Sequence, residues 1–281
     1  MRALAVLLLL GLAAVGGRAA EAPLVLRVMT YNLRYASERP PHAWPDRRPL
    51  MQALIARAAP DVIGTQEGLY QQLRELAAGL PAYEWIGLGR AGGSQDEFTA
   101  IFFRRDRFEP VAFDHFWLSD TPAAIGSITW GHTYRRMATW VRLRDRATGR
   151  EFEVWNTHFD HQVEEARQKS AALIRDRLAQ VDPAVPLVLV GDFNCPAGHS
   201  RAHEILTREA ALTDTWDAAA HRSNADLNSF NNFEPPKHEG ERIDWILARH
   251  PAGVEAAGVV GYEGLAQFPS DHFPVTATLQ F

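Results

Sequence analysis

Short apolar runs that end in a polar residue recur along this chain. The runs are about four to eight residues long and carry many β-branched and aromatic side chains, which is typical of buried β-strands. They predict strands at Leu24–Tyr31, Val62–Gln66, Ala100–Phe103, Thr139–Leu143, Glu151–His158, Leu187–Asp192, Arg242–Leu247 and Val275–Leu279. We therefore expect a protein built largely on β-sheet.

Segments with helical spacing of apolar and charged residues lie between these strands. They predict helices at Asp46–Ala58, Leu69–Ala78, Gln162–Ala179 and Arg201–Glu209. Strands and helices thus mix along the whole chain, as in an α/β protein. A short polar link at residues 144–150 joins two strands like a hairpin, so we expect antiparallel pairing and not a purely parallel sheet.

Composition indicates one globular domain. The chain has 281 residues, and no Ser/Gly-rich linker, charge block or repeat divides it. With 46% hydrophobic and 22% charged residues, it can bury a sizeable core. The net charge of −5 disfavours, without excluding, a protein that grips long duplex DNA. Cys195 is the only cysteine, which excludes an internal disulfide and a cysteine-based zinc site.

The first 22 residues have the pattern of a signal peptide. Arg2 gives a charged start, Ala3–Val15 an apolar stretch, and residues 20–22 a small-x-small cleavage site. An uncleaved anchor is the alternative, although it would need about 20 uninterrupted apolar residues. We expect export to the periplasm or the medium, a mature catalytic domain over residues 23–281, and no stable membrane insertion after cleavage.

Polar side chains suited to metal binding and proton transfer stand at or beside the strand ends. Strand ends are rigid positions from which α/β proteins project active-site groups, and Mg²⁺ or Mn²⁺ prefers oxygen ligands from Asp, Glu and Asn. A carboxylate beside an imidazole can also move a proton. The pattern predicts a metal-assisted hydrolytic site formed by Asn32, Glu67, His158, Asp192, Asn194, Asp244, Asp271 and His272.

Six short motifs resemble, in their order and spacing, the endonuclease/exonuclease/phosphatase superfamily. None is specific alone, but the match as a whole spans residues 26–281. They are Thr30-Tyr31-Asn32, Gln66-Glu67, Asn156-Thr157-His158, Gly191-Asp192-Phe193-Asn194, Arg242-Ile243-Asp244-Trp245 and Ser270-Asp271-His272. Trp117-Leu118-Ser119 and the stretch at residues 135–140 are similar to exported bacterial hydrolases related to the deadenylase and nocturnin branch.

The resemblance implies a fold and a reaction. The fold would be a four-layered α/β/β/α sandwich of two mixed, mainly antiparallel sheets, with the site at one rim. The reaction would be hydrolysis of a P–O bond by in-line attack of water, dependent on Mg²⁺ or Mn²⁺. Glu67 would be the principal metal ligand, and Asn32 and Asp271 would be its partners.

The resemblance also implies roles for five catalytic residues. Asp192 and Asn194 would orient and deprotonate the attacking water, and His158 would stabilise the developing charge. His272 would contact the phosphate, while Asp244 would accept a hydrogen bond from its other ring nitrogen. We favour Asp192 as the general base, but the sequence leaves the His272–Asp244 pair open for that role.

Several of these residues also have an ordinary structural interpretation. Turn formation would explain Asn32, Asn156 or Asp192 taken singly, and capping of the following helix would explain Glu67.

Two neighbouring pairs leave further alternatives open. Asp244 could pair with the adjacent Arg242. His158 and His161 have a spacing that suits zinc, but no cysteine or third close histidine supports this, so a surface role for His161 is favoured.

Substrate choice must depend on loops around the site. Arg135 and Arg136 lie beside aromatics and would hold a second phosphate or stack on a sugar or base, unless nearby carboxylates occupy them. Asn231, in the loop Ser229–His238, offers an amide contact. The arginines of Trp44–Arg48 reach either a phosphate or only solvent.

Four functions can be weighed against these observations. The leading hypothesis is an exported phosphoesterase acting on a small or medium phosphorylated molecule, such as a sugar phosphate, nucleotide or lipid headgroup. A secreted nuclease acting on DNA or RNA is the alternative. Sphingomyelinase-like action ranks lower because exposed aromatic loops are not obvious. An inactive binding module is disfavoured because no expected catalytic position carries an inert residue, and nothing implies a protein partner.

Overall fold

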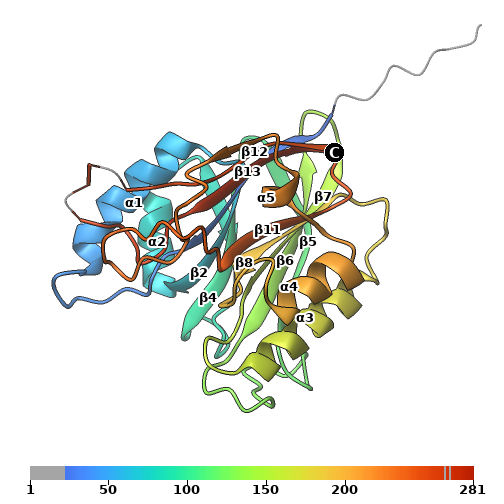
Figure 1. Ribbon diagram of the computed structural model, residues 1–281, viewed down its shortest axis with the longest axis horizontal. Coiled ribbons are helices and arrows are strands. Elements are labelled where there is room, and N and C mark those ends of the chain that lie inside the picture. The colour runs from blue at the N-terminus through green and yellow to red at the C-terminus, as the bar shows by residue number, and fades with distance from the viewer. Residues whose placement is uncertain (1–22, 263, 266) are drawn as a thin grey trace, which may run out of the picture.

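The computed structural model describes residues 23–262, 264–265 and 267–281, so the signal peptide predicted at residues 1–22 lies outside the described residues. Two β-sheets pack face to face, and helices cover their outer faces (Figure 1). The predicted α/β/β/α sandwich with two mixed sheets is confirmed.

The first sheet has seven strands in the order β10-β12-β13-β1-β2-β4-β3. Their bounds are β1 (Val25–Asn32), β2 (Val62–Leu69), β3 (Tyr83–Ile86), β4 (Glu97–Arg104), β10 (His221–Ser223), β12 (Gly253–Val259) and β13 (Val275–Gln280). β1 pairs antiparallel with β13 and parallel with β2. Asn32 pairs with Gln66 in this register, so the polar ends of β1 and β2 lie at the same edge.

The second sheet has six strands in the order β5-β6-β7-β8-β11-β9. Their bounds are β5 (Phe108–Trp117), β6 (Met137–Asp145), β7 (Glu151–His158), β8 (Leu187–Asp192), β9 (Thr213–Asp214) and β11 (Asp244–Arg249). β6 and β7 form the predicted antiparallel hairpin. Asp192 pairs with His158 on one side and with Asp244 on the other, which aligns three predicted site residues across neighbouring strands.

Helices cover the two outer faces of the sandwich (Figure 1). On the first sheet lie α1 (Trp44–Ala58) and α2 (Tyr70–Ala78). On the second sheet lie α3 (Glu164–Leu178) and α4 (Arg201–Glu204). α4 continues as a π-helical turn over Ile205–Glu209. A further short helix, α5, is Thr215–Ala218. No helix in the described ranges is both long and apolar enough to cross a membrane.

The observed elements differ from the predicted ones mainly at the edges of the sheets. Leu69 ends β2 instead of opening a helix, and Arg242 precedes β11. β3, β5, β9, β10, β12 and α5 were not predicted. β5 is an edge strand with a run of exposed residues, and β12 is rich in Gly and Ala, so neither has the apolar pattern of a buried strand.

Close packing between the sheets depends on Gly64 and Asn156. A Cβ at Gly64 would collide with Val190 and approach Asn156, so glycine allows β2 to lie against the second sheet. The buried Asn156 donates from Nδ2 to Thr65 O (2.8 Å) and Ala100 O (2.9 Å). Asn156 therefore links the two sheets, and because it lies within β7 it is not a turn former.

Candidate active site

The polar strand ends meet in a cleft of about 410 Å³ at one rim of the sandwich. Seven of the eleven predicted site residues line it: Glu67, Arg136, His158, Asp192, Asn194, Asp271 and His272. Asn32 and Asp244 lie beneath the lining and hydrogen-bond to it. Arg135 and Asn231 are not among the lining residues.

A β-bulge directs Glu67 toward the cleft. The register between β2 and β4 shifts between Thr65 and Gly68, and Glu67 has a φ of 62°. A non-glycine residue rarely adopts this left-handed conformation, and such local strain is concentrated at functional sites. Glu67 does not cap the following helix; its Oε2 accepts a hydrogen bond from Tyr35 N (3.2 Å).

Asn32 holds two carboxylates in place. Its buried Nδ2 donates to Glu67 Oε1 (3.1 Å) and to Asp192 Oδ2 (3.0 Å). Its Oδ1 accepts from Arg34 N (2.9 Å), as in an Asx turn. Asn32 is thus both a turn former and a bridge between the first sheet and Asp192.

Asp192 stands at the centre of the site. Its Oδ2 lies 3.4 Å from His158 Nε2 and 3.8 Å from His272 Nε2. The side chains of all three residues are nearly inaccessible to solvent. One carboxylate oxygen therefore faces two imidazoles in a largely dehydrated pocket. In such a pocket, fixed charges and hydrogen bonds assist proton transfer and stabilise a developing charge more than they do in water.

The backbone around Asp192 is shaped by its neighbours in the motif. A Cβ at Gly191 would collide with Thr157 O, so glycine permits the close approach of β8 to β7. Asn194 adopts a φ of 50° and donates from its backbone N to Asp192 Oδ1 (3.0 Å). Its Nδ2 donates to Phe159 O (3.0 Å). The turn fixes both the carboxylate and the amide at the cleft.

Burial and charge shift the ionisation of this centre. Burial, reinforced by Asp244, raises the pKa of Asp192 to about 7. Burial lowers the pKa of His272, but Asp244 and Asp192 outweigh it and raise that pKa to about 10. Burial, together with Arg136, lowers the pKa of His158 well below its usual value. Near neutral pH the site therefore combines a cationic His272 with a neutral His158.

His272 is held by Asp244. Its Nδ1 lies 3.0 Å from Asp244 Oδ2, whereas Asp244 Oδ1 is buried and has no hydrogen-bond partner among the described residues. Arg242 instead pairs with Asp214 (3.3 Å), so the simple pairing of Asp244 with Arg242 is excluded. The orphaned oxygen leaves the centre with capacity for a further donor.

The carboxylates of Glu67 and Asp271 form a donor set that fits a hard divalent cation. Arg34 Nη1 lies 3.9 Å from Glu67 Oε2 and 3.5 Å from Asp271 Oδ2, so a protein cation already approaches both. Burial raises the pKa of Asp271, and the nearby Glu67 acts in the same direction. Two such carboxylates suit Mg²⁺ or Mn²⁺, which would relieve their mutual repulsion.

A second set of candidate metal ligands lies next to the first. Among the described residues, ligand atoms of Asp192, Asp244 and His272 lie within 4.8 Å of one another. The His272–Asp244 hydrogen bond already occupies part of this set, so we favour Glu67 and Asp271 for the cation.

The zinc alternative for His158 and His161 is not supported. His161 Nδ1 lies 3.0 Å from Arg136 Nη2, which makes it a hydrogen-bond partner of that guanidinium. His158 instead faces Asp192. The two imidazoles therefore have separate partners, although His161 does line the cleft beside His158.

The arginines of the first helix have structural roles. Arg47 is fully buried, and its guanidinium donates to backbone carbonyls that include Leu33, Arg34 and Pro269. It thereby fixes the segments that follow Asn32 and precede Asp271. Arg48 pairs with Glu75 (2.9 Å). Neither arginine is among the residues that line the cleft.

The two loops predicted to bind substrate, around Arg136 and around Asn231, both reach the cleft, but only some of the predicted side chains line it. Arg136 lines the cleft, but Arg135 donates from Nε to Gly126 O (3.1 Å). Asn231 is buried and its Oδ1 accepts from Phe233 N (2.8 Å), while its neighbours Phe230 and Asn232 line the cleft. Consecutive side chains point in different directions, which a loop sequence alone does not resolve.

Arg90 and Glu97 form a wall of the cleft that was not predicted from the sequence. Arg90 N donates to Glu97 O (2.9 Å) across a tight turn that contains Gly92 and Gly93. Glu97 opens β4 and pairs with Leu69 at the end of β2, so it lies at the rim where β2 ends. The glycine pair between β3 and β4 was a sequence signal for a turn at this wall.

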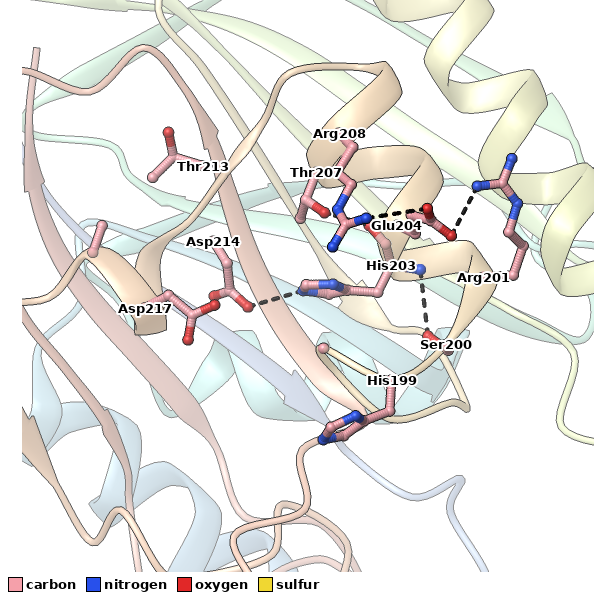
Figure 2. Close-up of a pocket in the computed structure, with 12 residues that line it drawn as sticks. His199, Ser200, Arg201, His203, Glu204, Thr207, Arg208, Thr213, Asp214 and Asp217 are labelled. Atoms are coloured by element: carbon pink, nitrogen blue, oxygen red, sulfur yellow. Dashed lines mark hydrogen bonds and ion pairs between the residues drawn. The ribbon is translucent and has the colours of Figure 1, made fainter.

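A second and larger cavity, of about 600 Å³, lies beside α4 and α5 (Figure 2). It contains a buried pair in which His203 Nε2 lies 3.0 Å from Asp214 Oδ2. Figure 2 shows the His203 ring pointing at Asp214, with His199 and Asp217 nearby. None of the predicted site residues lines this cavity.

The fold and the cleft define a class of α/β sandwich hydrolase with carboxylates and imidazoles gathered at one rim. The sequence profile of the Endonuclease/Exonuclease/phosphatase family matches residues 29–272, and the chain belongs to this family, whose members hydrolyse phosphoesters. The membership of this family that the sequence motifs predicted is therefore confirmed.

Solved structures of relatives agree with this assignment. An endonuclease/exonuclease/phosphatase family protein from Bacteroides thetaiotaomicron is 33% identical, with 92% of this chain and 99% of that chain covered and a TM-score of 0.86. A mannosyl-6-phosphatase from the same species is 34% identical, with 91% and 100% covered and a TM-score of 0.85. The human Nocturnin catalytic domain shares the fold at 20% identity, with 91% and 93% covered and a TM-score of 0.67.

One curated relative covers a shorter region. An uncharacterized protein of Acanthamoeba polyphaga mimivirus is 28% identical over 162 residues, which amount to 54% of this chain and 60% of that protein.

Proposed function

We propose that this protein is an exported, Mg²⁺- or Mn²⁺-dependent phosphoesterase that hydrolyses a P–O bond of a small or medium phosphorylated molecule. The observation that carries the proposal is the position of Asp192, whose Oδ2 faces the imidazoles of both His158 and His272. A carboxylate with a pKa raised to about 7 is well matched to accept a proton from water near neutral pH.

The side chains divide the reaction between them. Asp192 accepts the proton of the attacking water, and Asn194 orients that water beside it. The cationic His272, held by Asp244, binds a phosphoryl oxygen, and the neutral His158 donates a hydrogen bond to the charge that develops. Each role is consistent with the contacts and ionisation of the site.

Glu67, positioned by Asn32, and Asp271 would hold the divalent cation. When bound, the cation supplies neutralisation of negative charge on the phosphoryl oxygens. Asn32 presents its Nδ2 to both Glu67 and Asp192, which keeps the metal-binding carboxylate and the proton acceptor at a fixed separation.

A phosphorylated sugar is the substrate class that we favour. The mannosyl-6-phosphatase relative is 34% identical over nearly the whole chain. The cleft has a volume of about 410 Å³, which is the size of a site that encloses a small molecule. The net charge of −5 offers little general attraction for nucleic acid.

The test is a panel of substrates assayed with Mg²⁺, with Mn²⁺ and with EDTA. The panel includes p-nitrophenyl phosphate, bis-p-nitrophenyl phosphate, hexose phosphates, nucleotides, single- and double-stranded DNA, RNA and sphingomyelin. We expect metal-dependent turnover that is highest on a hexose phosphate. Full activity in EDTA would refute the metal requirement, and a preference for DNA or RNA would identify a nuclease instead.

Export is tested separately. Expression of the full chain in a bacterial host, followed by fractionation and N-terminal sequencing, should yield a periplasmic or secreted protein that begins near Pro23. Retention of the uncleaved chain in the membrane would support an anchor.

A further inference from the structure

The wall of the cleft beyond the catalytic residues has a chemistry of its own. We infer that Glu97, held by Arg90 and flanked by Tyr134, forms a subsite that binds the hydroxyl groups of the leaving group, so that the enzyme selects a phosphorylated sugar. The inference rests on the proposed phosphoesterase function and assigns residues to its specificity.

The Arg90–Glu97 pair is a rigid, planar arrangement of donors and acceptors. Arg90 Nη1 lies 2.9 Å from Glu97 Oε2, and Arg90 Nη2 donates to Glu97 Oε1 at 2.9 Å. Asp96 Oδ1 also lies 2.9 Å from Arg90 Nε, as an ion pair without the geometry of a hydrogen bond. Asp96 adopts a φ of 68°, which sets the direction of Glu97 as β4 begins. The remaining lone pairs of Glu97 are free to accept hydroxyl groups.

Glu97 is accessible from the cleft although its neighbours are buried. Its side chain is 17% exposed, compared with 8% for Arg90, and both residues line the cleft together with Asp192 and His158. A purely structural ion pair has no need to be placed on the wall of a catalytic cleft. The position instead puts a hydroxyl acceptor in the same cleft as the proposed catalytic residues.

An aromatic side chain adjoins this pair. Tyr134 is 45% exposed, lies 5.7 Å from the Arg90 guanidinium and 5.6 Å from the His161 ring, and lines the cleft. An exposed aromatic face next to planar polar groups suits a sugar ring, which has both C–H and O–H surfaces. Tyr35 and Phe230, which are also partly exposed, line the same cleft.

The balance of charge favours hydroxyl groups over a second phosphate. Arg90 is paired with two carboxylates, so it has little free positive charge. Arg136 lies 3.7 Å from Asp160 and bonds to His161. At Arg90 a second phosphate would therefore meet two carboxylates, whereas neutral hydroxyls match the mixed donors and acceptors of the Arg90–Glu97 pair.

The central test compares two leaving groups in the Glu97→Gln variant. Steady-state kcat/KM is measured for mannose 6-phosphate or glucose 6-phosphate and for p-nitrophenyl phosphate, which lacks sugar hydroxyls. We expect the ratio of the sugar phosphate value to the p-nitrophenyl phosphate value to fall at least about tenfold, mainly through KM. Glu151→Gln is the matched control, because Glu151 forms a similar two-contact pair with Arg144 outside the cleft.

Two further comparisons separate binding from a loss of structure. Tyr134→Ala should lower the same ratio, whereas Tyr134→Phe, which keeps the ring, should restore most of it. If Glu97 accepts a particular hydroxyl, a deoxy analogue of the sugar phosphate should be hydrolysed poorly by the wild type and should be insensitive to Glu97→Gln. Thermal unfolding of each variant verifies that it is folded.

The outcomes distinguish this inference from the proposed function. An unchanged ratio in Glu97→Gln, whether kcat/KM is kept or falls equally on both substrates, would overturn the sugar subsite. Hydrolysis of p-nitrophenyl phosphate by the wild type would still support the phosphoesterase. A wild type that hydrolyses no phosphate ester would overturn both. A preference for nucleotides with no response to sugar hydroxyls would overturn the subsite alone.

Discussion

Two buried histidine–aspartate pairs of the same length lie in different parts of the molecule. His272 lies 3.0 Å from Asp244 in the cleft, and His203 lies 3.0 Å from Asp214 in the second cavity (Figure 2). The second cavity is the larger of the two. Neither the pair itself nor the size of the cavity therefore identifies the active site.

The pairs differ in what surrounds the carboxylate. Asp214 also accepts from Trp216 N (2.9 Å) and pairs with Arg242 (3.3 Å), so both of its oxygens are satisfied. Asp244 Oδ1 has no partner among the described residues. A fully satisfied pair stabilises a fold, whereas a pair with unused capacity beside a further carboxylate can act on a ligand.

The imidazoles differ in the same way. His203 packs edge-on against the buried ring of Trp245, at 4.9 Å between centroids. His272 faces Asp192, which also contacts His158. The comparison indicates that His203 and Asp214 hold β9 and α4 together, while His272 and Asp244 serve the chemistry of the cleft.

Replacement of the central carboxylate should have the largest effect. We expect Asp192→Asn to lower kcat by at least about 10²-fold, because the proton acceptor is lost. The melting temperature should not fall, since burial disfavours the charged form of this residue and the amide carries no charge. Assays of kcat and of thermal unfolding check the two expectations. A kcat within about threefold of the wild type would show that Asp192 is not the proton acceptor.

Weakening of the proposed cation site should have the next largest effect. We expect Glu67→Gln to raise the Mg²⁺ concentration needed for half-maximal activity by about tenfold or more, because one anionic ligand is lost. Titration of activity with Mg²⁺ measures this shift, and excess Mg²⁺ should restore part of the rate. Glu75→Gln is a control on α2, outside the cleft.

Disruption of the second pair should affect stability and leave turnover nearly unchanged. Asp214→Ala removes the partner of both His203 and Arg242, and we expect it to lower the free energy of unfolding by about 3 kcal/mol. Urea unfolding measures the change. A fall in kcat of about tenfold or more in the folded variant would show that the second pair also supports catalysis.

A smaller effect concerns acid stability. Burial raises the pKa of Asp214, but His203 and Arg242 outweigh it, so the folded pKa lies below the usual value of about 3.9. This group therefore contributes stability above about pH 4 and loses it as the pH falls through the folded pKa. In urea unfolding from about pH 7 to about pH 3, the difference in stability between wild type and Asp214→Asn should narrow at the acid end. A difference that widens would contradict this sign.

The residues of the catalytic centre could be predicted because they follow strongly patterned strands. Glu151–His158 and Leu187–Asp192 have the predicted bounds, and each ends in a residue of the cleft. Buried central strands have clear apolar patterns, so their polar ends stand out. The pairings of Asp192 with His158 and Asp244 then follow from the register.

The cleft wall formed by Arg90 and Glu97 could not be predicted in the same way. Glu97 opens a strand whose apolar pattern begins later, and Arg90 lies in a loop before it. Which of two adjacent loop residues faces the cleft depends on local backbone geometry, as Phe230 and Asn231 illustrate. Long-range packing, and not local pattern, determines these positions.

The most direct test of the account compares the two matched carboxylates in one assay. Asp244→Asn and Asp214→Asn remove the same charge from pairs of the same length, and kcat on p-nitrophenyl phosphate with Mg²⁺ is measured beside the free energy of unfolding. We expect Asp244→Asn to lower kcat by about 10- to 100-fold and Asp214→Asn to leave kcat within about twofold while lowering stability. Equal losses of kcat, or a greater loss in Asp214→Asn, would contradict the assignment of the cleft as the catalytic centre.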